Sequence, residues 1–540
     1  MASVVTGAVT TRGSQYSRLG LATVSLVLFL TFLDNTIVSV VLGSVQADLH
    51  GGVSELQWVV NGYALVFAGF MLPFGTVADL FGRKKVMVAG VAVFCAGSLL
   101  GALAPNIDVL IASRVIMGLG AAASEPGTLS MIRHLYPDRQ VRARALGIWA
   151  AVSGLALAMG PVLGGVLVGI WSWRAIFWFN VAFGLLALCA ALKVLPESSD
   201  PGSKKLDYPG FLLGAGSITA ATFAVILGET AGYRTPLIDA LFAVAAAGVV
   251  TFLFVERRAK HPMLDPCYLK VRAFDGSNFV AFSTYFGVFS IFFFVALYLQ
   301  IVGNRSGYSI AELFAPMAAG LVVASLFAGR WVAVSGPRLP MLSGCILGGV
   351  GILLTDAFLT PQAGIGQIGW TLAITGIGFG TAIVPVTSTA LSVVPPEHSG
   401  MAASATNTSR ELGAVAGVAI LGSVVNGQLT ANLTQRLLAI NIPKSYIGTI
   451  ITDVETGTVG KQAAAFGSSN KAVNEIIQKV LQAVYGAFKH GLDLSLIAAG
   501  VILLVSAVVV VFCIPDRHAN DPAACLDHPE RKNSAQTADL

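Results

Sequence analysis

Several ionisable residues fall inside long apolar stretches of the sequence, and four of them are the first candidates for chemistry. They are Asp34, Arg114, Glu125 and Glu411. An ionised side chain is costly in an apolar environment, so each of these residues is a functional candidate by default. Carboxyl groups in such surroundings can bind and release protons or attract cations, and a guanidinium can hold a carboxylate in its charged form. The set therefore indicates proton transfer or charge recognition.

Asp34 and Arg114 are predicted to pair. Asp34 lies about fifteen residues into an apolar run that enters from the inside, which puts it roughly 10 Å from the external face at a rise of 1.5 Å per residue. Arg114 lies about five residues into a later run that enters from the outside, at a depth of roughly 8 Å. An acid held by an arginine can be protonated only when the pair opens or water enters, which suits a coupling site. The alternative is a static ion pair that only orients helices.

Glu125 and Glu411 are the other two acids of the apolar region. Glu125 follows Arg114 by eleven residues, about three helical turns, so both project from nearly the same face. It is predicted to attract cationic substrates or to relay protons; the alternative is a glutamate bonded to hydroxyls such as Ser124 or Thr128. Glu411 falls near the middle of its run and ranks second to Asp34 as a proton carrier, with a structural role as its alternative.

The elements that position these residues are membrane-spanning helices. The chain has 540 residues, of which 55% are hydrophobic and only 11% charged, and its mean hydropathy is +0.77. Apolar runs of about twenty residues, the length that crosses a bilayer, recur along it. We expect about fourteen spans, near residues 19–43, 56–76, 86–104, 109–132, 145–169, 174–195, 207–228, 236–255, 276–301, 311–333, 339–359, 366–394, 401–424 and 492–514.

A short charged stretch between the second and third runs sets the orientation. It contains Gly75, Asp79 and Gly82, followed by the basic residues Arg83, Lys84 and Lys85. Basic loops stay in the cytoplasm, so both termini are predicted to be cytoplasmic. The net charge of +5 gathers in the same loops, so it reports topology and predicts no nucleic-acid partner. The stretch from about 426 to 491 must then lie outside. From Lys471 to His490 it has the apolar spacing of an amphipathic helix, which would rest on the outer surface, cap the external mouth or form a solvated connector.

An internal repeat divides the chain. The pattern of Gly75, Asp79, Gly82 and Lys84 returns in weaker form as Gly329, Ala333, Gly336 and Arg338. We therefore predict an all-α polytopic membrane protein with two six-helix bundles, residues 1–195 and 261–515, two inserted helices in 196–260, and a cytoplasmic tail, 516–540. Pseudo-symmetric halves of this kind let secondary transporters present one midplane site to either side.

A second glycine pattern lies in the fifth predicted helix, where Gly147 is followed by Gly160, Pro161, Gly164 and Gly165. Small residues three and four apart let a neighbouring helix approach closely, and a proline bends a helix. Together with the charged stretch at 75–85, with Arg114, Gly118 and Gly120, and with residues 33–38, this pattern resembles the major facilitator superfamily, and within it the fourteen-helix drug/proton antiporters. The resemblance covers nearly the whole chain.

The resemblance implies a function. In that family the fifth-helix motif implies antiport, the first-helix acid and fourth-helix arginine imply proton coupling, and the charged loop implies gating. Two positions depart from the pattern. Ala156 stands where the exporter motif usually has a glycine, and the tenth helix has no acid of its own, although some multidrug members use one to bind cations.

The expected function is therefore proton-coupled efflux of hydrophobic or amphipathic small molecules across a bacterial plasma membrane. A dedicated exporter of a lipid or secondary metabolite, a proton-driven importer and a non-transporting receptor are the alternatives. Trp58, Tyr63 and Tyr298 could line an apolar substrate cavity with Glu125, and packing or lipid-facing roles are the alternative for such aromatic residues. The sequence has no HExxH, CxxC, GxSxG or GxxxxGK[ST] motif, which argues against an enzyme, a metal site or an ATP-driven pump. We expect no cofactor, and a monomer in the lipid bilayer.

Overall fold

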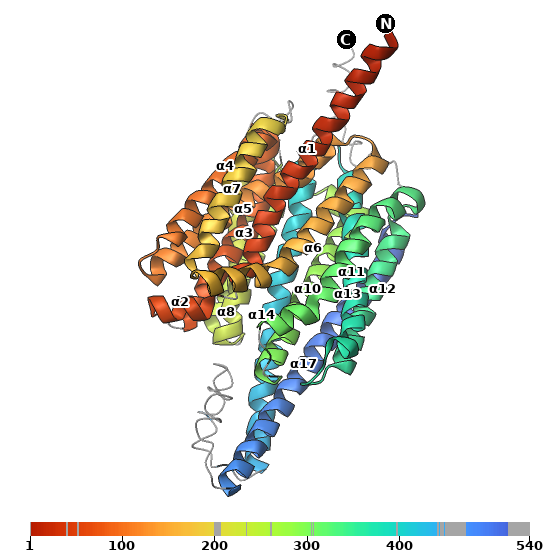
Figure 1. Ribbon diagram of the computed structural model, residues 1–540. Coiled ribbons are helices and arrows are strands. Elements are labelled where there is room, and N and C mark those ends of the chain that lie inside the picture. The colour runs from red at the N-terminus through yellow and green to blue at the C-terminus, as the bar shows by residue number, and fades with distance from the viewer. Residues whose placement is uncertain are drawn as a thin grey trace.

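The protein is a bundle of long helices (Figure 1). The computed structural model describes residues 2–38, 41–50, 53–198, 207–233, 235–259, 262–303, 305, 307–395, 398–439, 442, 448 and 471–516. The N-terminal half consists of six long helices and one short external helix. These are α1 (Ala2–Ile37), α2 (Leu42–Leu49), α3 (Val53–Phe81), α4 (Arg83–Ala102), α5 (Ile107–Leu135), α6 (Arg139–Ile170) and α7 (Arg174–Val194).

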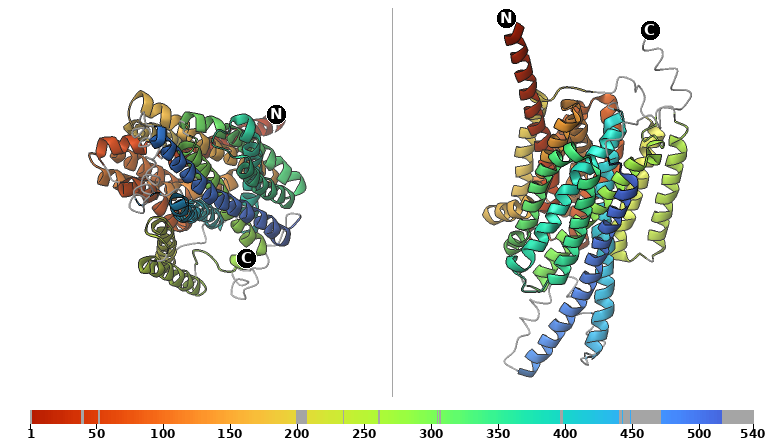
Figure 2. Two further views of the ribbon diagram at one scale, coloured as in Figure 1. Left: turned by 90° about the horizontal axis from the view of Figure 1, so that it is seen from below. Right: turned by 90° about the vertical axis from the view of Figure 1, so that its right-hand side faces the viewer.

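A helical pair separates the two halves in sequence. It is formed by α8 (Tyr208–Ala231) and α9 (Pro236–Glu256), and a short 3-10 turn, η2 (Tyr268–Lys270), follows it. The C-terminal half then contains α10 (Arg272–Ile301), α11 (Gly307–Ser335), α12 (Arg338–Phe358), α13 (Ile365–Val393), α14 (Ser399–Ala439) and α17 (Lys471–Cys513). Figure 2 shows α8 and α9 at the side of the bundle, outside the two halves.

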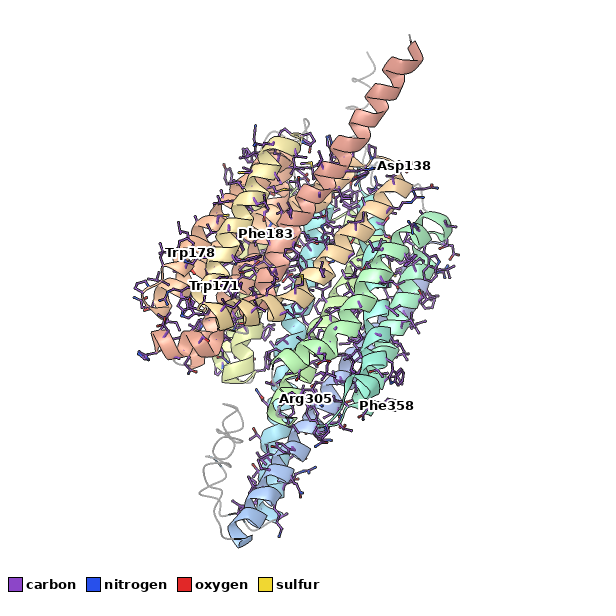
Figure 3. The ribbon with its side chains drawn as sticks, in the orientation of Figure 1. Asp138, Trp171, Trp178, Phe183, Arg305 and Phe358 are labelled. Carbon is purple, nitrogen blue, oxygen red and sulfur yellow. The ribbon has the colours of Figure 1, made fainter. Side chains whose placement is uncertain are left out.

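The helices are long and apolar enough to cross a membrane. Thirteen single helices in the described part of the chain meet this criterion, and the count reaches fourteen when the bent helix α6 is included. The predicted all-helical fold with about fourteen spans is confirmed. Figure 3 shows Asp138 at the end of the bundle from which the first part of α1 projects, and Arg305 and Phe358 toward the opposite end, as the charge pattern requires for a cytoplasmic N-terminus.

Three predicted boundaries were wrong. The first span ends at Ile37 instead of 43, and a separate helix, α2, follows it. The spans predicted at 401–424 and 492–514 are parts of much longer helices, because α14 runs on to Ala439 and α17 already begins at Lys471. The predicted amphipathic segment from 471 is therefore helical, but it continues the last span instead of lying on the membrane surface. The two extensions project together beyond the bundle (Figure 1).

The internal repeat is visible in the backbone. Gly82, at the start of α4, has a φ of 109°, and Gly336, before α12, has a φ of 81°. Both values lie in a region that side-chain-bearing residues rarely adopt, so glycine is required at the equivalent turn of each half. In each half a glycine one or two turns earlier packs against the other half. Gly75 of α3 abuts Ser404 of α14, and Gly329 of α11 abuts the backbone of Ala143 in α6.

The halves meet along two helix pairs, α3 with α14 and α6 with α11, and α5 also contacts α14. The inserted helix α8 packs against both α3 and α14, whereas its partner α9 packs mainly against α8. The domain boundaries at 195 and 260 remain predictions, but this packing places α8 beside the seam between the halves.

Candidate functional site

Asp34 and Arg114 form an ion pair in the interior of the N-terminal half. The Nη1 atom of Arg114 lies 2.5 Å from Oδ2 of Asp34, and the two side chains are 1% and 0% exposed. Asp34 lies in the last turn of α1, and Arg114 lies two turns into α5. The matching depths predicted from sequence therefore correspond to a real contact.

The other atoms of this pair are also engaged. Asn180 of α7 donates from Nδ2 to Oδ1 of Asp34 at 2.7 Å, and Arg114 donates from Nε to the carbonyl of Val59 in α3 at 2.9 Å. The guanidinium lies over the ring of Tyr63, 4.5 Å from its centre. Four helices, α1, α3, α5 and α7, thus meet at one charged cluster. Sequence reasoning missed Asn180, although a carboxamide within an otherwise apolar span was a signal for it.

A second polar cluster joins the two halves and centres on Arg410 of α14, which is 1% exposed. Its guanidinium lies over the rings of Trp149 in α6 and Tyr285 in α10, with centroid distances of 5.1 and 5.5 Å. It also donates to Asn407 at 2.9 Å and to the hydroxyl of Thr387. Trp149 is fully buried. Arg410, the neighbour of Glu411, is therefore the cation at the centre of this cluster. Sequence reasoning did not single it out.

Glu125 and Glu411 lie beside this cation. Both are buried, at 1% and 3% exposure, and Glu125 interacts electrostatically with both Arg410 and Glu411. The Oε2 atom of Glu125 has no hydrogen-bond donor. The hydroxyls that were suggested as partners do not donate to the Glu125 carboxylate. Thr128 donates to the backbone carbonyl of Glu125, and Ser124 donates to that of Ala121. That alternative was wrong.

Asp79 forms hydrogen bonds that connect the cytoplasmic ends of the two halves. Its carboxylate accepts hydrogen bonds from the backbone amides of Gly400 and Met401, at 3.2 and 3.1 Å, in the first turn of α14. Arg83 holds the same carboxylate from its own half at 2.8 Å. Negative charge is favourable at a helix N-terminus. A second contact nearby crosses between the halves, where Arg133 of α5 donates to the carbonyl of Val394 at 2.7 Å.

The rest of the charged stretch is tied to the end of α7. The amide of Lys84 donates to the carboxylate of Glu197 at 3.1 Å, and its ammonium donates to the carbonyl of Leu192 at 2.8 Å. Lys85 is exposed. In the other half Ala333 replaces Asp79, and α6 is capped by its own Asp138, which accepts from the amide of Val141 at 2.9 Å. At this turn the acid that bridges the halves, Asp79, therefore lies in the N-terminal half and has no counterpart at Ala333 in the C-terminal half.

The glycine pattern of α6 divides between two neighbours. Gly147 faces α11, where an added Cβ would stand 2.7 Å from the carbonyl of Ser325. Gly160 abuts Thr36, two residues after Asp34 in α1. Between Leu157 and Val162, the stretch that contains Gly160, α6 bends by 43°. Gly165 has open space around it, Gly164 is buried, and the side chain of Pro161 lies outside the described residues.

Of the four residues predicted to share a substrate cavity, Tyr63 and Glu125 interact electrostatically with each other, whereas Trp58 and Tyr298 contact other helices. Tyr63 belongs to the Asp34 cluster and donates to the carbonyl of Thr31 at 3.3 Å, while Glu125 belongs to the Arg410 cluster. Trp58 contacts Phe223 of the inserted helix α8, with ring centres 5.7 Å apart, and Tyr298 contacts Phe488 of α17 at 6.0 Å. Their role in substrate binding remains a prediction.

Comparisons with known proteins agree with this architecture. A family model described as Major Facilitator Superfamily matches residues 24–418. The human organic anion transporter MFSD10 superposes with a TM-score of 0.60 over 92% of this chain and 99% of its own, at 13% identity, which shows a shared fold. The chain belongs to the major facilitator superfamily and is a multi-pass membrane transporter.

Bacterial relatives match most of the chain. Multidrug resistance protein Stp of Mycobacterium tuberculosis (strain CDC 1551 / Oshkosh) is 33% identical over 410 residues, 76% of this chain and 76% of Stp. Drug efflux pump JefA of the same strain is 31% identical over 501 residues, 90% of this chain and 96% of JefA. The expectation of a transporter, and not an enzyme, is confirmed.

Proposed function

We propose that this protein exports hydrophobic or amphipathic drugs in exchange for protons. The observation that carries the proposal is the Asp34–Arg114 pair, a carboxylate and a cation enclosed in a membrane-spanning bundle. The similarity of this chain to Stp and JefA, which are named as a multidrug resistance protein and a drug efflux pump, supports drugs as the class of substrate. The transporter would work as a monomer in the lipid bilayer and need no cofactor.

Asp34 is the proposed proton carrier. Its two carboxylate oxygens are held by Arg114 and Asn180, so protonation would weaken both contacts and change how α1, α5 and α7 hold together. Gly160 of α6 packs beside Thr36 at the same end of α1, which gives such a change a route to a helix that also contacts the other half. Glu411, with Arg410 beside it, is the second proton-binding candidate.

Alternating access requires the cytoplasmic contacts to open. Asp79, which Arg83 pairs with in its own half, and Arg133 hold the halves together at that end, so substrate from the cytoplasm would bind after these contacts separate. Protonation from the outside would favour the return of the empty carrier, and substrate binding from the inside would displace the proton. One charge crossing the membrane supplies about 2.3 kcal/mol per 100 mV. This energy can sustain a substrate gradient of at least about tenfold.

The test is drug-dependent proton movement. Inverted membrane vesicles with an internal pH indicator are energised, and a panel of lipophilic cations and neutral drugs is added to vesicles with and without the protein. We expect several compounds to collapse the proton gradient only when the protein is present. If none does so although the protein is folded, the multidrug proposal fails, and a dedicated exporter of a lipid or secondary metabolite becomes the hypothesis to test.

A further inference from the structure

Two acids lie close together at one end of the inserted helical pair. Asp207 is the N-cap residue of α8, where its Oδ1 atom accepts a hydrogen bond from the amide of Gly210 at 3.0 Å. Glu256 is the last residue of α9 and is 1% exposed. The chain reaches α8 from the end of α7 that contacts Lys84 of the charged stretch. This end of the inserted pair is therefore cytoplasmic.

Each of the two acids has one oxygen without a hydrogen-bond donor. The Oδ2 atom of Asp207 and the Oε1 atom of Glu256 are both buried and unpartnered. Both point toward Gly210, where an added Cβ would stand 2.7 Å from the first oxygen and 2.6 Å from the second. Two carboxylates that face one buried point repel each other unless one of them is neutralised. A proton can neutralise such a pair, and a proton, unlike a larger ligand, needs no cavity.

The surrounding charges do not neutralise the pair. The charged groups that act most strongly on Glu256 are Asp207 and Asp265, and both are acids. Arg257 and Arg258 follow Glu256 directly, but both are exposed and neither forms an ion pair with a described residue. Negative charge is favourable at a helix N-terminus, so Asp207 is the acid that stays ionised and Glu256 is the one that carries the proton.

The other oxygen of Glu256 holds the segment that follows α9. Its Oε2 atom accepts a hydrogen bond from the amide of Leu264 at 3.4 Å. The preceding residue, Met263, is buried, and its carbonyl accepts from the hydroxyl of Thr76 in α3 at 3.4 Å. Thr76 follows Gly75, which abuts α14. The contacts of Glu256 therefore lead through this segment to α3 at the seam between the halves.

We propose that Asp207 and Glu256 bind one proton between them, and that this proton holds residues 262–264 and the inserted pair against α3. In the protonated state Glu256 donates from Oε1 toward Oδ2 of Asp207, and its Oε2 atom accepts from the amide of Leu264. When the cytoplasm becomes alkaline, the proton leaves to water. A buried pair of charged acids is costly, so the side chain of Glu256 then turns toward water and releases the amide.

The proposed site is a cytoplasmic proton sensor. It is separate from Asp34 and Glu411, the acids proposed to couple transport to protons, and it gives the inserted helices a role that does not depend on drug export. Thr76 is the residue that α3 presents to this segment, and its hydroxyl is uncharged. The response to pH therefore belongs to the acid pair.

Infrared spectroscopy tests whether the proton is bound. The purified full-length protein in lipid nanodiscs is titrated from acid to alkaline pH, and the C=O stretching band of protonated carboxyl groups is followed. We expect Glu256→Gln to lack part of this band at neutral pH. Asp239→Asn is the matched control, because it removes an exposed acid at the other end of α9 and should retain the whole band. Identical bands in the parent and Glu256→Gln at every pH overturn the proposal.

Hydrogen exchange tests what the proton does. Peptides that cover residues 262–264 are followed by mass spectrometry, and each variant is compared with the parent at the same pH. Glu256→Gln and Asp207→Asn each remove the repulsion between two charged acids, so both should keep this segment protected at alkaline pH. The parent should exchange there about tenfold or more faster, because it loses a buried hydrogen bond. Asp239→Asn should behave like the parent.

Equal exchange in the parent and in both variants at alkaline pH overturns the proposal, and so does faster exchange in the variants. Thermal denaturation checks that each variant is folded, and Asp207→Asn carries the exchange test alone if Glu256→Gln does not fold. Neither measurement uses a drug or a proton gradient, so the result is independent of the proposed export function.

Discussion

At the scale of single residues, the buried Asp34 carboxylate depends on donors from two other helices. Arg114 donates to one carboxylate oxygen and Asn180 donates to the other. A buried acceptor that loses its donor costs about 1–3 kcal/mol. The pairing with Arg114 could be predicted because depth along a helix follows from residue counting. The contact with Asn180 could not, because it depends on how α7 is rotated against α1, which neither residue count nor charge determines.

The first prediction concerns Asn180. Asn180→Ala should lower the free energy of unfolding by about 1–3 kcal/mol, because it leaves Oδ1 of Asp34 buried without a donor. Thermal denaturation of the purified protein measures the effect. Asn432→Ala is the control, because among the described residues this carboxamide donates to Gln428 on its own helix and its loss should change little. Equal effects from the two variants would show that the Asn180 contact contributes no specific stability.

The second prediction concerns the ring over Arg410. Trp149→Phe keeps an aromatic face but loses the indole donor to Thr128, which lies at 3.1 Å, whereas Trp149→Leu removes both. A buried cation–aromatic contact contributes about 2 kcal/mol, so we expect drug efflux to fall about tenfold or more in the leucine variant and much less in the phenylalanine variant. Trp370→Leu, at an exposed ring contact with Phe358, is the control. Equal losses in both Trp149 variants would contradict a role for the aromatic face.

At the scale of helices, we expect the cytoplasmic contact between α3 and α14 to act as a latch, meaning a contact that must open before the cytoplasmic side can open. Asp79→Asn removes the anion that caps α14 and pairs with Arg83. We expect this change to weaken the latch by about 1–3 kcal/mol and to increase the time that the cytoplasmic side spends open. The measurement is maleimide labelling of a cysteine placed at Ser404, which packs against Gly75 in the latched state.

The control for the latch is Asp138→Asn. Asp138 caps α6 within its own half, so its loss should leave the labelling rate at position 404 nearly unchanged. If Asp79→Asn also leaves that rate unchanged, the contact does not hold the cytoplasmic side closed.

The short external helix α2 supplies a prediction about pH. Hydrogen bonds from Arg174 and Trp173 hold the pKa of Asp48 below its ordinary value, with contacts of 2.5 and 3.0 Å. A lowered pKa contributes stability that is present above the unfolded value of about 3.9 and is lost as pH falls through the folded value. In Asp48→Asn the melting temperature should therefore fall less steeply than in the parent as the pH is lowered.

Melting temperatures between about pH 6 and pH 3 measure this effect, which will be small because the site is exposed. Asp108→Asn serves as the comparison, because this first-turn acid of α5 forms no ion pair with a described residue. If the melting temperature falls equally steeply with decreasing pH in Asp48→Asn and in the parent, the contact of Asp48 with Arg174 and Trp173 does not contribute pH-dependent stability.

Element boundaries show what the sequence could predict at this scale. The apolar runs located most spans, because the bilayer requires about twenty apolar residues of each. Hydropathy cannot show where a helix ends outside the membrane. It therefore missed α2, and it missed the extensions of α14 and α17, where Leu433 and Leu437 pack in the same apolar cluster as Val484 and Phe488. Those residues are stabilised by packing against each other.

At the scale of the whole molecule, two charged clusters occupy different positions. The Asp34 cluster lies within one half, whereas the Arg410 cluster, with Trp149 and Glu125, lies across the interface of the two halves. The repeat in the sequence predicted two halves, and the equivalent positive φ angles of Gly82 and Gly336 agree with it. The sequence did not predict that α8 would pack against both α3 and α14, because hydropathy carries no information on which helices are neighbours.

The central claim is that Asp34 couples drug movement to proton movement. Its most direct test compares the parent with Asp34→Asn in inverted vesicles, measuring both drug-dependent pH change and exchange of labelled for unlabelled drug. Exchange needs no net proton transfer. We expect the variant to keep drug exchange and to lose the pH change. A variant that still moves protons with drug at the parent's rate would contradict the claim and transfer the coupling role to Glu411 or Glu125.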